Sequence, residues 1–455
     1  MSKDPRDIAV WALADRQGYV TKRLHGLLAA NDLSPQDKSL ARELALGTCR
    51  RRATVRAVLH AYMQDPSRPL PGALKEILDI AGYQLLFLDR VPDHAVVNEA
   101  VKQTIRHRHR RKSGLVNGVL RTITRELSEV LDGPPPAAAD VIPVRPGAFR
   151  RSERKVFPDP GSDAVGYLAA AYSLPPALAR RWLSNFGSLS AAGEVAMHAN
   201  VRAPLILRVN RLRGTVDDAL RALADESVEA VAHKNGQSVV VLDRGAPSGL
   251  KAFRDGLLQV QDASATAVVE AADAKPGMRV LDFCAAPGTK TTHLAEKMDN
   301  RGGIMAVDVS GEKLVRVREN CERMGVSTVT TCLAEQAGGL KPESFDLVLA
   351  DVPCSNTGVL ARRAEARWRF SEEALARIVK DQRTILGLAA TFVAPGGRLV
   401  YSTCSVEPEE CSQTVEAFLA QNSGFELVRD KLSMPGGATD PATWHDGGYY
   451  ALLGR

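Results

Sequence analysis

Two cysteines in this sequence stand where a thiol could act on a bound molecule. Cys354 ends the segment Asp351-Val352-Pro353-Cys354, and Cys404 lies within Ser402-Thr403-Cys404-Ser405. Both segments follow short apolar runs that are typical of β-strands, so we expect both thiols at strand ends. A single cysteine is usually a buried structural residue, whereas two at neighbouring strand ends favour one shared site. A thiolate at such a site can act as a nucleophile.

Methyl transfer to carbon 5 of a pyrimidine is a reaction that needs such a thiol. Carbon 5 is a poor nucleophile until a thiolate adds to carbon 6, which leaves an enamine that can accept a methyl group. Loss of the carbon-5 proton and departure of the thiolate then restore the ring. An acid near N3 of the base, here Asp351, would offset the charge that develops. The residues alone do not decide which thiol attacks.

A third strand end carries the pattern of an adenosyl-binding loop. Small residues there would let a ligand approach the backbone, and the following helix would offer free N–H groups. The loop is neither a phosphate-binding P-loop nor a G-x-G-x-x-G dinucleotide motif. Asp308 closes the next strand, where a carboxylate can accept both ribose hydroxyls. The candidate loop residues are Cys284, Ala285, Ala286, Pro287, Gly288, Thr289 and Lys290.

A doubly wound α/β sheet would bring these strand ends together. From Val280 onward, short apolar segments alternate with helical ones, a pattern typical of a parallel sheet with helices on both faces. Ligands bind such sheets at the C-terminal ends of the strands. We therefore expect an α/β, Rossmann-like domain over residues 256–455.

The rest of the chain divides by periodicity and composition. Apolar residues recur at helical spacing through the first third, which predicts an all-α bundle over residues 1–130. Residues 131–160 are rich in proline and predict a semi-rigid linker. Residues 161–255 mix helical and strand-like segments and predict a small α+β subdomain.

Composition and charge favour a globular protein that meets nucleic acid. The 455 residues are 45% hydrophobic and 25% charged, which is typical of a globular protein. The sequence has no run of about 20 apolar residues and no apolar signal core. We therefore expect a cytoplasmic protein with no membrane partner. Seven cysteines without a C-x-x-C pair argue against a disulfide framework or a structural metal. Residues 1–155 hold 27 basic and 17 acidic residues, and the run 106–112 favours contact with phosphates.

In their order, these motifs resemble the RNA cytosine-5 methyltransferases, specifically the bacterial 16S ribosomal RNA subfamily with an N-terminal NusB-like domain. The catalytic part of the resemblance rests on DFCAAPGTKT, AVDVS, DVPCSNTG and YSTCSVEPEE. In the first third it rests on ARELALGTCRR, AGYQLLFLDRVPDHAVVNEAV and VNGVLR. The resemblance implies RNA-binding roles for the helical bundle and for the α+β subdomain.

The resemblance also implies an activity and roles for single residues. S-adenosylmethionine would be the cofactor and a cytosine of ribosomal RNA the substrate. Cys404 would be the nucleophile, Cys354 would assist release of the product, and Asp351 would contact both base and cofactor. The loop residues from Cys284 to Lys290, together with Asp308, would hold the cofactor. We expect a monomer that uses no metal.

The sequence departs from the family pattern at four places. Thr289 replaces a glycine, Glu335 is a weak substitute for the adenine-contacting acid, and Cys411 stands where asparagine is common. The segment 364–368 keeps a cation and an aromatic, Arg367 and Trp368, for RNA. Further possible stacking platforms are Tyr401 and Trp444.

Two other functions remain open from the sequence. A non-catalytic RNA-binding scaffold is favoured by the departures at Thr289 and Glu335. A methyltransferase acting on small molecules or proteins would leave the basic first third unexplained.

Overall fold

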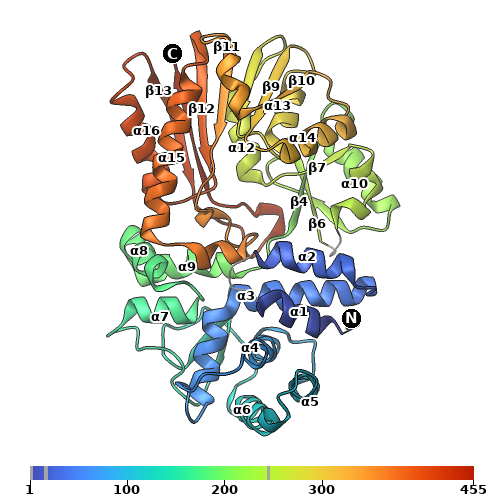
Figure 1. Ribbon diagram of the computed structural model, residues 1–455, viewed down its shortest axis with the longest axis vertical. Helices are drawn as coiled ribbons and strands as arrows, with labels where there is room; N and C mark the ends of the chain where they lie inside the picture. Colours follow the sequence, from blue (N-terminus) through green and yellow to red (C-terminus); the bar gives the residue numbers. More distant parts are fainter. Residues whose placement is uncertain (1–3, 15–18, 243–245) are drawn as a thin grey trace. The chain divides into compact units, whose positions relative to one another are not determined.

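The computed structural model describes residues 4–14, 19–242 and 246–455, which form two compact units (Figure 1). The first comprises Met1–Val201 together with Leu360–Ser371. The second comprises Arg202–Val359 and Glu372–Arg455. Of the helices in these described residues, none combines the length and apolar character that a bilayer-spanning segment requires.

The first unit begins with a helical bundle, as the periodicity predicts. Its helices are α1 (Pro5–Ala14), α2 (Val20–Ala30), α3 (Pro35–Tyr62), α4 (Gly72–Phe87), α5 (Asp93–Arg106) and α6 (Ser113–Glu126). Ser34 caps α3 by accepting the Asp37 N–H at 3.1 Å, and Pro35 starts the helix where no N–H partner is needed. Ile8, Leu44 and Leu74 are fully buried where α1, α3 and α4 meet.

The predicted linker over 131–160 is instead largely folded. It forms an antiparallel sheet in the order β1-β3-β2, with bounds Leu131–Asp132, Ala148–Arg151 and Val141–Arg145. Val141 and Ile142 are fully buried, and the Arg51 guanidinium of α3 donates to the carbonyl oxygens of Pro143 and Val144. These tertiary contacts order a segment whose composition alone predicts no core. Helices α7 (Ala164–Ala171), α8 (Pro176–Phe186) and α9 (Leu189–Asn200) follow it.

A short segment from the second half of the chain completes the first unit. In the 3-10 helix η5 (Ala364–Arg369), the Arg367 guanidinium is fully buried and donates to the carbonyl oxygens of Ser173 (3.1 Å) and Ala199 (2.6 Å). Trp368 donates its indole N–H to the Cys49 carbonyl at 2.8 Å. The expectation that Arg367 is a cation for RNA is therefore wrong, because this side chain satisfies buried backbone oxygens.

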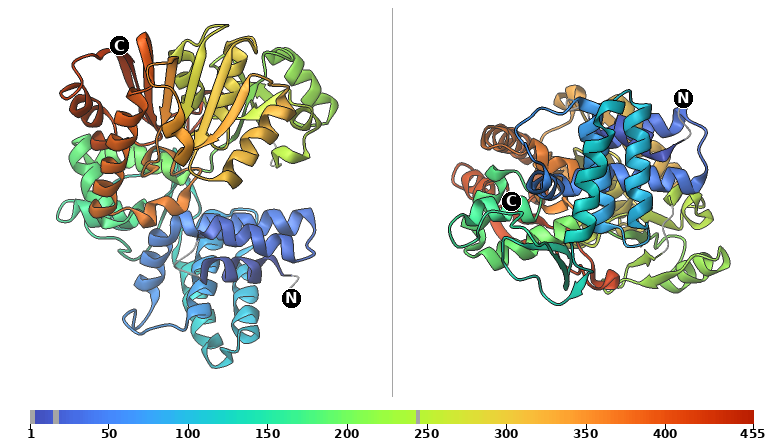
Figure 2. Two further views of the ribbon diagram at one scale, coloured as in Figure 1. Left: turned by 45° about the horizontal axis from the view of Figure 1, so that its top comes forward. Right: turned by 90° about the horizontal axis from the view of Figure 1, so that it is seen from below.

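The second unit is built on a seven-stranded mixed sheet in the order β10-β9-β8-β11-β12-β14-β13 (Figure 2). Its strands are β8 (Arg279–Phe283), β9 (Gly303–Asp308), β10 (Val329–Leu333), β11 (Phe345–Asp351), β12 (Val393–Thr403), β13 (Glu426–Ser433) and β14 (Gly448–Gly454). The first five in this order are parallel, and β14 is antiparallel to both of its neighbours.

Helices cover both faces of this sheet. Helices α12 (Ala263–Ala272), α13 (Thr289–Lys297) and α14 (Gly311–Met324) share an apolar cluster with Leu349. Helices α15 (Glu372–Ala390) and α16 (Ser412–Leu419) share another with Val348, whose side chain points to the opposite face. The expected Rossmann-like fold is confirmed. Tyr401 and Trp444 are at most 1% exposed, so the expectation that they stack on RNA bases is wrong.

A smaller sheet lies beside this one within the second unit. Its order is β5-β6-β4-β7, with bounds Ala230–Ala232, Ser238–Val241, Leu205–Val209 and Leu258–Val260, and its helices are α10 (Val216–Asp225) and α11 (Lys251–Arg254). Buried Arg208 of β4 donates to Gln261 and forms an ion pair with buried Glu296 of α13. This pair joins the later part of the predicted α+β subdomain to the larger sheet. The prediction of one subdomain over 161–255 is wrong in extent, because residues 161–201 belong to the first unit.

We expect Arg367→Met to lower the free energy of unfolding of the first unit by about 3 kcal/mol, because it leaves buried carbonyl oxygens without donors. Urea titration measures this loss. Arg111→Met, at an exposed position of the same unit, is the matched control. Equal stability of the two variants would contradict the role given to Arg367.

Candidate active site

The register of two parallel strands brings the two thiols together. Asp351 at the end of β11 lies opposite Ser402 of β12, and the loops that follow carry Cys354 and Cys404. Their Sγ atoms lie 2.9 Å apart, although fifty residues separate them in the chain. Both side chains are half-buried. This contact brings the two thiols together, as their expected places at neighbouring strand ends predict.

Contact between the sulfurs changes the acidity of Cys354. Either sulfur could be the donor in this contact. A hydrogen bond donated by Cys404 lowers the pKa of the Cys354 thiol below its ordinary value. Burial and the charge of Glu410 act to raise this pKa, but they do not outweigh the hydrogen bond. The Cys404 thiol also lies 3.5 Å from Asn356 Oδ1. One proton can therefore be shared between the two sulfurs, and a thiolate is favoured on Cys354.

Other cysteines of the chain are held in the thiol form. Burial raises the pKa of Cys284 to about 12 and that of Cys321 to about 11. Burial also raises the pKa values of Cys49 and Cys411. Thiolate chemistry is therefore favoured at the Cys354–Cys404 pair over these four positions.

Asp351 is oriented by two donors. Lys290 Nζ lies 2.7 Å from its Oδ2, and the Ser402 hydroxyl donates to its Oδ1 at 2.7 Å. Burial acts to lower the pKa of Lys290, but the Asp351 charge outweighs it and the pKa lies above its ordinary value. A lysine from the candidate cofactor loop thus meets the carboxylate beside the thiol pair, so the two predicted sites are continuous.

The candidate cofactor loop turns sharply between β8 and α13. Cys284 adopts a left-handed backbone with φ of 68°, and Gly288 has φ of 94°. A Cβ atom on Gly288 would lie 3.1 Å from Val317 Cα, so glycine is required there. Thr289 is the first residue of α13, where the helical backbone needs no glycine. The departure from the family pattern at Thr289 is therefore accommodated.

Acidic side chains stand at the two neighbouring strand ends. Asp308 ends β9, and its carboxylate accepts the Ala286 N–H at 3.2 Å and the Ser310 N–H at 3.3 Å. Exposed Glu335 follows β10, whose Leu333 pairs with Asp308. Small loop residues beside a carboxylate suit the ribose of an adenosyl group. The loop residues and the carboxylates at these strand ends therefore fit S-adenosylmethionine.

Glu410, in the 3-10 helix η6 (Pro408–Glu410), is a residue of this site that the sequence motifs did not predict. It is fully buried and accepts hydrogen bonds from Ser355, Gln382 and Ser405. Its one signal in the sequence is an acidic residue close after the Ser-Thr-Cys-Ser segment, which on its own fits an exposed turn.

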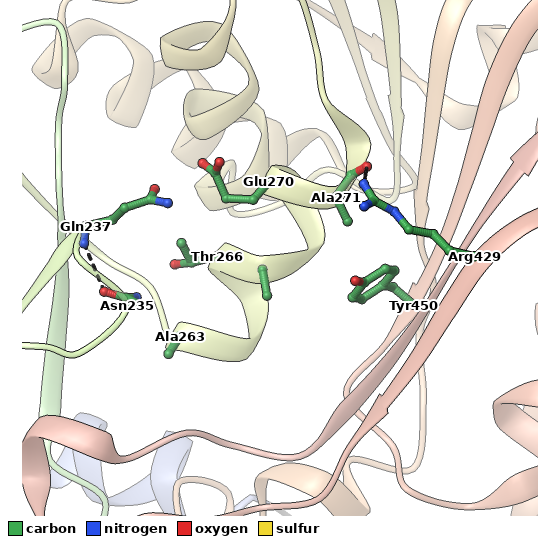
Figure 3. Close-up of a pocket in the computed structure, with 9 residues that line it drawn as sticks. Asn235, Gln237, Ala263, Thr266, Glu270, Ala271, Arg429 and Tyr450 are labelled. Atoms are coloured by element: carbon green, nitrogen blue, oxygen red, sulfur yellow. Dashed lines mark hydrogen bonds between the residues drawn. The ribbon is translucent and has the colours of Figure 1, made fainter.

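A groove of about 350 Å³ in the second unit lies away from these thiols (Figure 3). Glu270 on its wall accepts hydrogen bonds from His293 (3.2 Å) and Lys297 (2.8 Å), and the His293 bond is the main reason that its pKa falls to about 2. Arg429 donates to the Ala271 carbonyl at 2.6 Å. These charged groups are engaged within the protein, so the groove adds no reactive group to the candidate site.

Comparisons with known proteins agree with this geometry. The chain is 32% identical over 430 residues to "Ribosomal RNA small subunit methyltransferase B" of Klebsiella pneumoniae, covering 92% of this chain and 91% of that protein. It is 31% identical over 427 residues to "Probable ribosomal RNA small subunit methyltransferase B" of Bacillus subtilis, covering 92% and 89%. The chain belongs to the family of these methyltransferases.

Family models match each part of this methyltransferase chain. Residues 4–125 match the NusB family, 174–248 a ferredoxin-like domain described as Methyltr_RsmF/B-like, and 269–443 the 16S rRNA methyltransferase RsmB/F. These matches confirm the expected all-α, α+β and Rossmann-like parts.

Solved structures share the methyltransferase fold. A methyltransferase homolog from Pyrococcus horikoshii is 26% identical with a TM-score of 0.55, covering 64% of this chain and 99% of that one. NSun6 from Pyrococcus horikoshii with SFG is 19% identical with a TM-score of 0.54, covering 62% and 98%, and shows the fold alone.

We expect Cys404→Ala to raise the pKa of Cys354, because the substitution removes the thiol that donates to its sulfur. The thiolate fraction of Cys354 at pH 7 should then fall. Peptide-resolved alkylation by iodoacetamide across pH 6–10 measures the midpoint. Cys332→Ala on β10 is the matched control, and an unchanged Cys354 midpoint in Cys404→Ala would contradict the shared proton.

Proposed function

We propose that this protein transfers a methyl group from S-adenosylmethionine to carbon 5 of a cytosine in 16S ribosomal RNA, through a covalent bond between Cys404 and carbon 6. The contact of Cys354 with Cys404 beside Asp351 carries this proposal. The ribosomal RNA substrate is supported by the names of the family's members.

Bound S-adenosylmethionine supplies an electrophilic methyl group. The loop residues Cys284 to Lys290 would border it, Asp308 would accept its ribose hydroxyls, and Glu335 would stand near its adenine. These roles follow from the strand ends on which the residues lie and from their chemistry.

The thiol pair would activate the base by moving one proton. Cys404 Sγ adds to carbon 6 while its proton passes to Cys354 Sγ, 2.9 Å away. Asp351 would hold a proton at N3 so that addition does not leave an uncompensated negative charge. Lys290, at 2.7 Å, has a raised pKa and would keep its own proton, so that its positive charge stabilises the Asp351 carboxylate once the shared proton has moved onto N3.

Release would reverse the proton movement. After carbon 5 has accepted the methyl group, it loses its proton to a solvent water molecule, and the bond between Cys404 and carbon 6 breaks as the ring double bond re-forms. The proton at N3 returns to Asp351. Cys354 returns its proton to the departing Cys404 sulfur, which restores the coupled pair. In this scheme both thiols are required, although only Cys404 forms the bond to the base.

Surface charge on the first unit supports an RNA partner. Arg108, which follows α5, and Arg110 and Arg111 of the 3-10 helix η1 (Arg110–Lys112) are exposed, so they can meet phosphates. The target cytosine would be unpaired or swung out, because carbon 6 is inaccessible in a stacked helix. We further propose a cytoplasmic monomer that needs no metal ion.

A non-catalytic scaffold has less support than the sequence suggested. It rested on the departures at Thr289 and Glu335. Thr289 begins α13 in ordinary helical geometry, and the thiol pair has no purpose in a scaffold.

We expect Cys404→Ala to lower methyl transfer by about 10⁴-fold or more, because the nucleophile is lost. Cys354→Ala should permit attack but slow release, so that a covalent RNA–protein adduct accumulates. Tritiated methyl transfer to 16S ribosomal RNA measures the first effect, and denaturing gel electrophoresis detects the second.

Cys321→Ala on α14 is the matched control and should retain activity and form no lasting adduct. Normal turnover by both Cys404→Ala and Cys354→Ala would overturn the thiol mechanism.

A further inference from the structure

We propose that Glu410 is a positioning residue that holds Cys354 and Cys404 at their working separation. Its carboxylate binds the residue next to each thiol, and neither comparison nor sequence motif assigns it this task. The catalytic consequence rests on the proposed function, whereas the effect on the thiol pair can be measured without RNA.

One side of the carboxylate fixes the loop after β11. Glu410 Oε1 accepts the Ser355 N–H at 2.8 Å, and Oε2 accepts the Ser355 hydroxyl at 2.5 Å. Ser355 directly follows Cys354, so these two bonds fix the backbone on the C-terminal side of that thiol. Asn356 adds a bond from its side-chain amide to the Cys354 carbonyl at 2.8 Å.

The other side fixes the loop after β12. The hydroxyl of Ser405, which directly follows Cys404, donates to Glu410 Oε2. Ser405 also lies 3.0 Å from the Thr357 hydroxyl, and the Gly358 N–H donates to the Cys404 carbonyl at 3.1 Å. Both thiol loops therefore meet at one carboxylate, with weaker direct links between them.

Helix α15 supplies a third anchor. Fully buried Gln382 donates from Nε2 to Glu410 Oε1 at 2.9 Å and to the Pro353 carbonyl at 2.9 Å. Tyr401 donates its hydroxyl to the Glu410 carbonyl at 2.6 Å. Glu410 is thus fixed to helix α15 through its carboxylate and to strand β12 through its backbone carbonyl.

A carboxylate suits this position better than any other side chain. Glu410 is fully buried and accepts bonds from a backbone N–H, two hydroxyls and an amide. Only an ionised carboxylate offers two oxygens that accept and never donate. Glutamine would replace one acceptor by a donor, and aspartate would keep the charge but be too short to reach both loops.

Two variants distinguish the effect of side-chain length at position 410 from the effect of its charge. Glu410→Asp keeps the charge and shortens the side chain, and Glu410→Gln keeps the length and removes the charge. If Glu410 acts by position, Glu410→Asp should lower kcat about 100-fold, since a displacement of about 1 Å can cost that much. It should leave the KM for S-adenosylmethionine unchanged, because Asp308 and Ala286 lie on other strand ends.

The thiols themselves give a readout that needs no RNA. In Glu410→Asp, the midpoint of Cys354 alkylation should move to higher pH, because Cys404 no longer stands close enough to donate to it. A purely electrostatic role predicts the opposite pattern, with Glu410→Asp like the wild type and the Cys354 midpoint lowered in Glu410→Gln. That pattern would overturn the proposal.

Variants that remove less of the hydrogen-bond network test the same role with less risk that the protein fails to fold. Ser405→Ala removes one bond to Glu410 and should lower kcat by about tenfold. The effects of Glu410→Gln and Ser405→Ala on kcat should combine to less than the product of the two single effects, because both changes weaken the same bond. Glu296→Gln, another buried carboxylate of the second unit, should lower stability without moving the Cys354 midpoint.

Wild-type kcat and an unmoved Cys354 midpoint in Glu410→Asp and Ser405→Ala would overturn the role of Glu410. An enzyme that fails to methylate RNA, but whose Cys354 midpoint still moves in Glu410→Asp, would overturn the proposed function and leave this inference standing.

Discussion

The pairing of β11 with β12 is the constraint on which the site depends. Because Asp351 lies opposite Ser402, the two loops that follow leave the sheet side by side, and Cys354 and Cys404 come into contact. A slip of one residue would turn the side chains of one strand to the other face. Buried Glu410 then fixes the loops where the sheet hydrogen bonds end. Acidity of the thiol pair is therefore a consequence of strand register.

The order of the strands in the sheet also sets the order in which the candidate functional residues stand along its edge. Along β10, β9, β8, β11 and β12, the strand ends carry in turn Glu335, Asp308, the loop that ends in Lys290, Asp351 and Cys404. Residues suited to an adenosyl group thus lie at one end and Cys404, the proposed nucleophile, at the other. The Lys290–Asp351 ion pair joins the two halves at the centre. A methyl donor held by the first group would therefore stand beside a base held by the second.

Motifs at strand ends could be predicted from the sequence because they combine local turn chemistry with a repeating strand–helix pattern. The folding of 131–160 could not, since it depends on Arg51, some ninety residues away, reaching two carbonyl oxygens. Burial of Arg367 escaped prediction for the same reason: its acceptors come from distant parts of the chain. Glu410 was missed because an acidic residue in a turn is usually solvated, and only the fold reveals its donors.

The sulfur atom that bonds to the base decides whether the proposed mechanism is correct. RNA containing 5-fluorocytidine at the target position tests this directly, because fluorine cannot leave as a proton does and the adduct persists after methylation. Incubation with S-adenosylmethionine, nuclease and protease digestion, and mass spectrometry would locate the modified peptide. We predict the methylated nucleotide on Cys404. Attachment to Cys354, or turnover of ordinary RNA with no adduct from the fluorinated one, would contradict the account.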